Sequence, residues 1–279
     1  MTVKSKASLS FYFCFVSEAI KVKQKILIGA GSKSDKAAFY QRLQGFLNPQ
    51  HEYFFTFLCL DYFQEPVLAH SEHDENSSSQ IIKRMEFEME VELISTQANR
   101  NIDVFKAQLT PPSLHGLTKV ADLLIIDSEV YEEYGRQRIG EIIEEVNCPV
   151  FILPNCKQVS RLILVHDPNE HSINMVKHFL KLAHQDLTKL PLSVLFAFPD
   201  DDEQTENEKF FVEYLKMSFP NLGLQLMIQE PIDELMINLN ADLGKAIIMV
   251  GQKLGVEILN YSNSTTVFTL RSPLFIHKS

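Results

Sequence analysis

Three residues that follow one apolar segment could take part in acid–base chemistry: His166, Asp167 and His171. Histidine has an ordinary pKa near neutrality, so it can exchange protons at physiological pH. Catalysis of acyl or phosphoryl transfer would also need a nucleophile in a recognisable turn, and no Ser or Cys of that kind accompanies these residues. We therefore interpret the two histidines as polar residues at the rim of a sheet.

Two polar segments could bind metal ions. The first, His70-Ser71-Glu72-His73-Asp74-Glu75, contains ligand-type side chains, but no partner outside the segment would converge with them on one zinc or manganese ion. The second, Asp200-Asp201-Asp202-Glu203, lacks the glycine and the closing glutamate of a calcium loop. Both segments are predicted to be solvated loops, and no metal site is expected.

Composition limits the classes of partner. The chain has 279 residues and a net charge of −10, so it is long enough for two domains, and it lacks the basic excess that broad contact with nucleic acid or an anionic membrane requires. The four cysteines show no CxxC spacing, which favours a reduced, cytoplasmic setting. Cys148, before Pro149, is explained by packing, because no basic neighbour would lower its pKa.

The first residues are a separate question. Lys4 and Lys6 precede a short apolar stretch, residues 9–16, which faintly resembles a signal peptide. The stretch is short and aromatic, and no good cleavage site follows it. We expect residues 1–24 to form an N-terminal arm or an extra strand, and no apolar run reaches the length of a membrane helix.

The chain contains an internal repeat. The segments 121–127 and 148–154 have counterparts at 245–251 and 272–276, and the same separation of 124 residues relates Asp127 to Gly251 and Pro149 to Pro273. Two further apolar segments, 25–28 and 161–165, begin the two copies, and each precedes a polar turn and a helical pattern. Repetition at this spacing indicates one structural unit used twice.

Each copy is predicted to fold as β-α-β-loop-α-β-α-β. Continuous apolar segments, which include 53–60 and 192–198, are typical of strands buried on both faces of a parallel sheet. Helices are expected at 80–99, with Ile81, Met85, Met89 and Leu93 along one face, and at 208–217. The fold class is therefore α/β, with two tandem doubly wound, Rossmann-like parallel sheets.

The domain boundaries follow from the repeat. We expect a first domain over 25–154, a linker over 155–160 and a second domain over 161–279.

The order and spacing of these segments resemble the universal stress protein family in its tandem two-domain form. The resemblance covers about residues 25–279 and depends on KILIGAG and RLILVHD as first strands, VADLLIID and GKAIIMVG as fourth strands, and CPVFILP and SPLFIHK as fifth strands. It implies an adenine nucleotide alpha hydrolase-like sheet of five parallel strands per domain. It also implies that domains pair through their last strands, here as an intrachain pseudo-dimer, and it leaves a homodimer of chains open.

Some members of the family bind ATP or AMP, and the resemblance implies where. An Asp at the end of the first strand contacts the adenosine, and Asp167 stands there in the second half, whereas the first half has Gly31. A loop of the form G-x2-G-x9-G-[ST] follows the fourth strand, and its glycines let backbone N–H groups approach phosphates. In the second half Gly251 matches this pattern, and Gly255 comes one place late on a shortened loop.

The first half departs further from that pattern. Asp127, Glu129, Glu132 and Glu133 place carboxylates where phosphates would lie, and like charges at short range repel. Degenerate motifs in both halves therefore favour a non-enzymatic, stress-associated interaction or regulatory protein with an unknown protein partner. The alternatives are an ATP- or AMP-responsive switch that uses only the second half, through Asp167, Gly251 and Gly255, and an enzyme, for which neither a base nor a phosphate cradle is complete.

Overall fold

The structure is a computed structural model that describes residues 23–60, 75–98, 100, 102–107, 109–130, 136–156, 158–166, 172–196, 202–227, 245–260 and 272–278. For residues 75–80, 136–138 and 202–205 it describes the backbone alone. Residues 1–22 of the expected N-terminal arm, the histidine-rich segment 70–74, and Asp167 and His171 lie outside these residues, whereas Lys23 and Gln24, expected in the arm, belong to the first strand.

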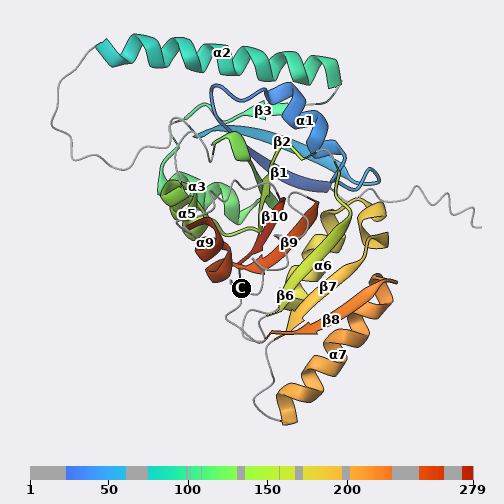
Figure 1. The fold of residues 1–279 in the computed structure, drawn as a ribbon. Helices are drawn as coiled ribbons and strands as arrows, with labels where there is room; N and C mark the ends of the chain where they lie inside the picture. The colour runs from blue at the N-terminus through green and yellow to red at the C-terminus, as the bar shows by residue number, and fades with distance from the viewer. Residues whose placement is uncertain are drawn as a thin grey trace, which may run out of the picture.

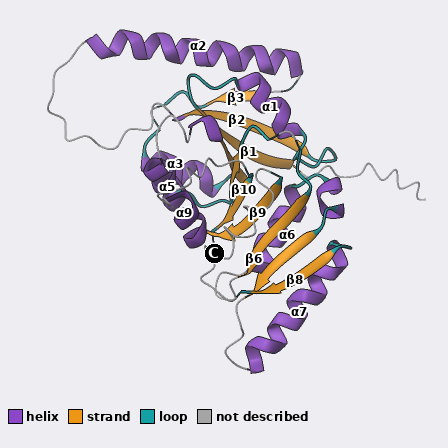
Figure 2. Cartoon of the chain, viewed as in Figure 1, coloured by secondary structure: helices purple, strands orange, loops and turns teal. Residues whose placement is uncertain are grey.

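Helices and strands alternate along the chain (Figures 1 and 2). In chain order they are β1 (Lys23–Ala30), α1 (Lys36–Gln44), β2 (Glu52–Cys59), α2 (Glu75–Ala98), β3 (Ile102–Val104), α3 (Pro111–Lys119), β4 (Leu123–Asp127), α5 (Arg136–Glu145), β5 (Val150–Leu153), β6 (Arg161–His166), α6 (Ser172–Leu182), the short 3-10 helix η3 (Gln185–Lys189), β7 (Leu192–Phe196), α7 (Asp202–Ser218), β8 (Leu222–Leu226), β9 (Ala246–Gly251), α9 (Gln252–Asn260) and β10 (Leu274–His277).

All ten of these strands form one sheet in the order β3-β2-β1-β4-β5-β10-β9-β6-β7-β8. Each half therefore has the same internal order, with its first strand between its second and fourth strands. Every pair within a half is parallel, because each crossover returns the chain to the end of the sheet at which the strands begin. β4 and β9 are buried along their whole length, as expected for apolar strands covered on both faces. The α/β, Rossmann-like fold class predicted from the sequence is confirmed.

Helices cover both faces of the sheet. One core packs under α1, α2, α6 and α7, and includes Phe39, Phe87, Phe179 and Phe211. The other packs under α3, α5 and α9, and includes Leu114, Ile142 and Ile258. The alternating residues of each central strand supply both cores, so the sheet is the middle of three layers.

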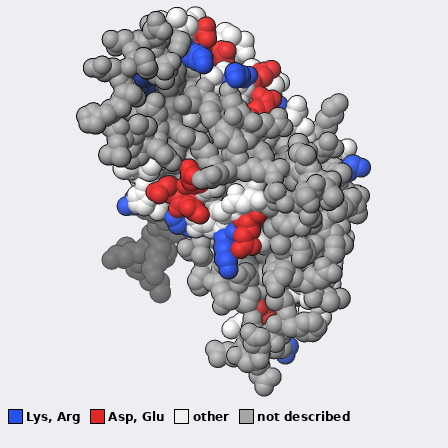
Figure 3. Space-filling view, turned by 60° about the vertical axis from the view of Figure 1, so that its left-hand side comes forward, with Lys and Arg blue, Asp and Glu red and all other residues white. Residues whose placement is uncertain are grey.

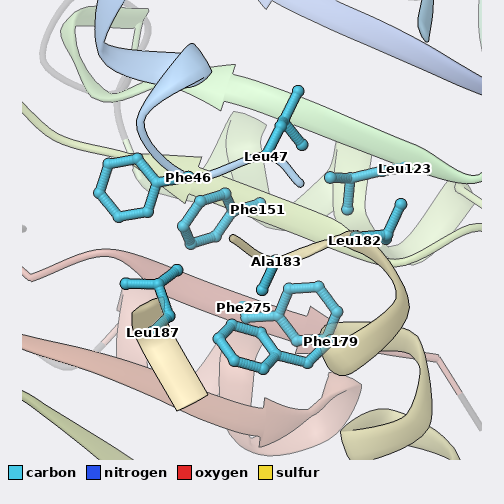
Figure 4. A pocket seen from close by; sticks show the side chains of 9 residues that line it. All are labelled: Phe46, Leu47, Leu123, Phe151, Phe179, Leu182, Ala183, Leu187 and Phe275. Atoms are coloured by element: carbon cyan, nitrogen blue, oxygen red, sulfur yellow. The ribbon is translucent and has the colours of Figure 1, made fainter. Parts of the chain in front are cut away.

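The last strands of the two halves join them, because β5 pairs with β10 in the antiparallel direction. Beside this pair, Leu47 and Ala183 form an isolated antiparallel bridge, and the amide of His184 donates to the carbonyl of Phe46 at 2.7 Å. Aromatic rings fill the join, with the centroids of Phe151 and Phe275 at 6.2 Å. They line a small apolar hollow of about 20 Å³ (Figure 4), which has room for about one water molecule.

The opposite face of the sheet holds the halves together as well. α5 packs against α9, and the side-chain amide of Gln252 donates to the carbonyl of Ile143 at 2.9 Å. Lys278, just after β10, donates to the carbonyls of Glu144 and Val146 at 3.2 and 2.9 Å. These carbonyls end α5, where a cation also interacts favourably with the helix dipole.

Several elements differ from the sequence predictions. α2 begins at Glu75 rather than residue 80, and α7 begins at Asp202 rather than residue 208, so the end of the acidic run Asp200–Glu203 is helical and not a loop. The pattern of the residues also missed β3, β8 and α3. β3 has three residues, which is too short to show a period, and β8 is an edge strand whose residues are mostly exposed.

The apolar positions that predicted α2 from the sequence are not the ones that pack on the sheet. Ile81, Met85, Met89 and Leu93 face solvent, with side chains 57–67% exposed. The sheet instead receives Phe87, Val91 and Ile94, which are almost fully buried. α2 carries two apolar faces, and sequence spacing alone did not show which one the sheet covers.

Of the described helices, none is long and apolar enough to cross a membrane. On the face shown in Figure 3, the described charged side chains form a few small groups in which acidic and basic residues lie near one another.

Candidate functional site

The carboxyl ends of the central strands are the places where ligands bind in open α/β sheets. In the first half these ends are Ala30 of β1 and Asp127 of β4, and in the second half they are His166 of β6 and Gly251 of β9. The registers of β1 with β4 and of β6 with β9 place the two residues of each pair side by side at the carboxyl end of the strands.

In the first half Asp127 occupies this edge. Its carboxyl group is completely buried, and Oδ1 accepts a hydrogen bond from the backbone N–H of Glu129 at 3.2 Å. Residues 128–130 are helical, so Asp127 binds one N–H of this helical turn, that of Glu129, as an N-cap residue does. A guanidinium nitrogen of Arg42, on α1, lies 3.7 Å from Oδ1. The protein's own carboxylate thus holds the position where a phosphate could contact this helix end.

Burial raises the pKa of Asp127 from 3.8 to about 6. The Glu129 N–H and the Arg42 charge favour the ionised form and oppose this shift, but they do not cancel it. Asp127 therefore exchanges its proton at mildly acidic pH, well above the range of an exposed aspartate.

The loop after β1 is closed by Lys36, a buried lysine at the first position of α1. Its ammonium group donates to the carbonyls of Ser32 and Ser34 at 3.1 and 3.2 Å and to Glu90 Oε2 on α2 at 2.6 Å. It also lies 4.8 Å from the centroid of the Phe87 ring. No sequence signal singled out Lys36, since a lysine in a polar turn is usually exposed.

In the second half the corresponding strand end has no side-chain carboxylate. Gly251 takes the place of Asp127, and α9 begins at the next residue, so the stretch expected as a phosphate loop is helical from Gln252 to Asn260. The first turn of α9 holds no acidic residue and carries Lys253. Unlike the first half, this helix therefore begins without a carboxylate at the strand end before it.

Gly255 lies inside α9 rather than in a loop. A Cβ at this position would lie 2.9 Å from three carbons of the Ile276 side chain on β10, which is closer than real Cβ atoms pack. Packing of α9 on the last strand therefore accounts for a glycine here, and the phosphate contact expected for Gly255 stays a prediction.

Two pairs of polar side chains lie near the carboxyl ends of the strands of the second half. His166 Nε2 lies 2.7 Å from the Glu208 carboxylate on α7, and the His166 ring stacks on Phe211 with centroids 4.5 Å apart. This hydrogen bond and the ring stacking fix His166 in place. Asp167, the residue expected to contact adenosine, follows His166 but lies outside the described residues.

The second pair joins α6 to the last strand. His178 Nδ1 lies 2.8 Å from His277 Nε2, so an N–H of one ring donates a hydrogen bond to the unprotonated nitrogen of the other. Partial burial and the nearby Lys181 ammonium lower the pKa of His178. In the aligned helices of the two halves, His178 occupies the position of Arg42. The Asp127–Arg42 contact of the first half is therefore replaced in the second half by a histidine pair.

Other candidate chemistry is limited in the part of the chain that the structure describes. There, no group of three or more His, Cys, Asp or Glu side chains could hold a metal ion. Cys148 is buried, and burial raises the pKa of its thiol to about 12, so it stays protonated at neutral pH.

Known proteins resemble this chain in structure rather than in sequence. No protein-family model matches it, and no curated protein does so either. The structure of a universal stress protein from Archaeoglobus fulgidus DSM 4304 is similar, with a TM-score of 0.64 and 12% sequence identity, over 91% of this chain and 96% of that chain. The cytoplasmic domain of a prokaryotic cation chloride cotransporter matches over 91% and 95% of the two chains at 13% identity, but its TM-score of 0.44 supports no argument.

At 12% identity the first of these likenesses establishes the fold alone. The chain has the Rossmann-like α/β fold of a universal stress protein.

Proposed function

We propose that this chain is a non-enzymatic regulatory module of the universal stress type, which acts in the cytoplasm by contacting a protein partner. The two halves, residues 25–154 and 161–279, form an intrachain pseudo-dimer in which the first half has lost nucleotide binding. The pairing of β5 with β10 and the packing of α5 on α9 support this arrangement.

The observation that carries the proposal is the position of the Asp127 carboxylate. It binds the helix N-terminus that a phosphate would otherwise contact, with Arg42 beside it. A nucleotide phosphate at this place would meet a carboxylate in a buried setting, where repulsion between like charges is strong. Lys36 closes the neighbouring loop onto α2, which leaves its ammonium already bound to protein oxygens.

Nucleotide titration of the full chain tests the proposal. Isothermal titration with ATP, ADP and AMP should show no saturable binding in the first half, and the purified protein should not turn over ATP. The matched variant Asp127→Gly removes the carboxylate and introduces the residue type found at Gly251. Wild-type binding at two sites per chain, or turnover of ATP, would overturn the proposal.

A second candidate function is a nucleotide-responsive switch in the second half, through Asp167, Gly251 and Gly255. Gly251 leaves the strand end before α9 without a carboxylate, and Lys253 adds a positive charge in the first turn of that helix. This candidate predicts one ATP or AMP site per chain, detected as a thermal shift. Gly251→Asp, which copies the first half, and Asp167→Ala should both abolish the shift, whereas a flat wild-type response to both nucleotides rules the switch out.

A further inference from the structure

The outward face of α2 carries exposed apolar side chains that packing on the sheet does not explain. Ile81, Ile82, Met85, Met89 and Leu93, which we call the α2 stripe, have side chains 57–67% exposed. At 3.6 residues per turn they lie opposite Phe87, Val91 and Ile94, the residues that pack on the sheet. α2 runs along the edge of the molecule, outside α1 and β3 (Figure 1), so the sheet does not cover the stripe.

Exposed apolar residues that are scattered singly need no explanation, but a continuous stripe does. From Ile81 to Leu93 the stripe extends about 18 Å, which is enough for about three turns of a partner helix. Two of its residues are methionines, whose flexible thioether side chains adapt to the shape of an apolar partner.

Charges on the described side chains of α2 are arranged asymmetrically around the helix. Glu86 and Glu90 border the stripe on one side, and Glu88 and Glu92 border it on the other. Lys83 and Arg84 lie toward the side that packs on the sheet. Lys36 engages Glu90 and Arg84 engages Glu88, whereas Glu86 and Glu92 take part in none of the ion pairs among the described residues.

The acidic borders favour some binding partners of the stripe over others. A second copy that paired through the same stripe would set glutamates against glutamates in either direction, because both borders are acidic. A membrane surface is also disfavoured, since interfacial helices carry Lys and Arg beside their apolar face and anionic lipids repel glutamate. A segment with apolar residues flanked by Lys and Arg matches both the stripe and its borders.

We infer that the α2 stripe and its glutamate borders dock a cationic amphipathic helix of a partner protein. This inference rests on the proposed interaction role and specifies the chemistry of the partner. Apolar residues at helical spacing on the partner cover the stripe, and its basic residues face Glu86 and Glu92.

The test measures binding of a fluorescent amphipathic Leu/Lys peptide of about 18 residues to the full chain by anisotropy, at about 0.15 M salt. Met85→Gln/Met89→Gln keeps the net charge and should weaken binding about tenfold or more. The matched control Phe210→Gln/Met217→Gln changes two exposed apolar residues on α7, 66% and 78% exposed, and should leave binding unchanged. Equal affinity of the Met variant and the wild type would overturn the inference, because attraction to an acidic protein would then explain all the binding.

Charge is tested separately. Glu86→Gln/Glu92→Gln should weaken binding and reduce its dependence on salt, and a Leu/Glu peptide of the same apolar pattern should not bind. Binding of the Leu/Glu peptide as tightly as the Leu/Lys peptide would overturn the assignment of a cationic partner. The nucleotide titrations address the strand ends and not α2, so failure of the peptide assay and failure of the proposed function are distinguishable.

Photocrosslinking identifies the occupant directly. With benzoylphenylalanine in place of Met89 in the full chain, irradiation should link α2 to the Leu/Lys peptide. A crosslink to α2 of a second chain, to residues 1–22 of the same chain, or to anionic vesicles in preference to the peptide would overturn the inference in favour of that occupant.

Discussion

The proton equilibrium of Asp127, at the carboxyl end of β4, makes stability depend on pH. Because its pKa is raised from 3.8 to about 6 by burial, the folded state binds this proton more tightly than the unfolded state does. Its contribution is most favourable below about pH 4 and is lost as pH rises toward about 6. This is the reverse of the usual behaviour of an ion-paired carboxylate, which loses its contribution as pH falls.

Asp127→Asn removes this titration while its side-chain oxygen can still accept the Glu129 N–H. Between about pH 4 and pH 7 the unfolding free energy of the variant should gain about 1–3 kcal/mol relative to wild type. Urea unfolding across this pH range measures the difference. Asp186→Asn is the control, because Asp186 is exposed and its pKa is lowered by Lys189, so its titration falls below this window. A constant difference between Asp127→Asn and wild type would contradict the assigned pKa shift.

Gly255 offers a test of packing against ligand contact. Gly255→Ala should lower the unfolding free energy by about 1–3 kcal/mol, since the new methyl group meets Ile276. Gly116→Ala is the matched control, because no atom lies within 4 Å of its added Cβ and alanine favours the helix. Thermal unfolding should show destabilisation in the first variant and none in the second. If Gly255→Ala kept full stability but lost a nucleotide response, the phosphate role would be favoured.

Among the elements, α2 and the β1–α1 loop are joined by a single buried lysine. Lys36→Met leaves the carbonyls of Ser32 and Ser34 and the Glu90 carboxylate without their shared donor, so it should destabilise the protein by about 2–4 kcal/mol. Lys83→Met, at an exposed site on α2, should change stability by less than about 0.5 kcal/mol. A double-mutant cycle with Glu90→Gln should give a coupling of about 1 kcal/mol by chemical denaturation, because Glu90 is half exposed. Additive effects would show that the 2.6 Å contact contributes nothing to stability.

The elements also show how far the sequence could be read. The central strands were predicted because a strand covered on both faces must be continuously apolar, and the segment at 123–127 is buried throughout. α2 was predicted as a helix, but the sequence did not show which of its faces is buried, since Phe87, Val91 and Ile94 lie opposite a second apolar stripe. Only the position of the sheet decides between two such faces.

The site was predicted less completely than the fold. The carboxylate of Asp127 was expected at the strand end, but its use as a cap for the following helix depends on backbone geometry. The reason for Gly255 lies in Ile276, a residue of another element, which spacing along the chain does not reveal. The contact of Lys36 with Glu90 joins residues 54 positions apart and is invisible in either local pattern.

The join between the halves spans all three layers of the molecule, which predicts cooperative unfolding of the whole chain. Phe151→Ala and Phe275→Ala each remove an aromatic ring from the join and should cost about 3–5 kcal/mol. Native-state hydrogen exchange should show β4 and β9 opening together in the wild type and at different free energies in the double variant. Phe210→Ala, at an exposed site, should leave exchange unchanged. Separate opening of the halves in the wild type would contradict this prediction.

The place of β10 in the sheet has a consequence for synthesis on the ribosome. The five strands of the first half are contiguous in the chain, so this half can fold early, but among the described strands the free edge of β5 is covered by β10, which follows all the other strands of the second half. Throughout translation of the second half, β5 presents unpaired backbone groups that another strand could occupy. Two neighbouring nascent chains could exchange their β10 strands, giving a swapped dimer with the same antiparallel contact. Slow translation between β5 and β10 should therefore increase the yield of swapped dimers, and a chaperone that shields β5 should decrease it.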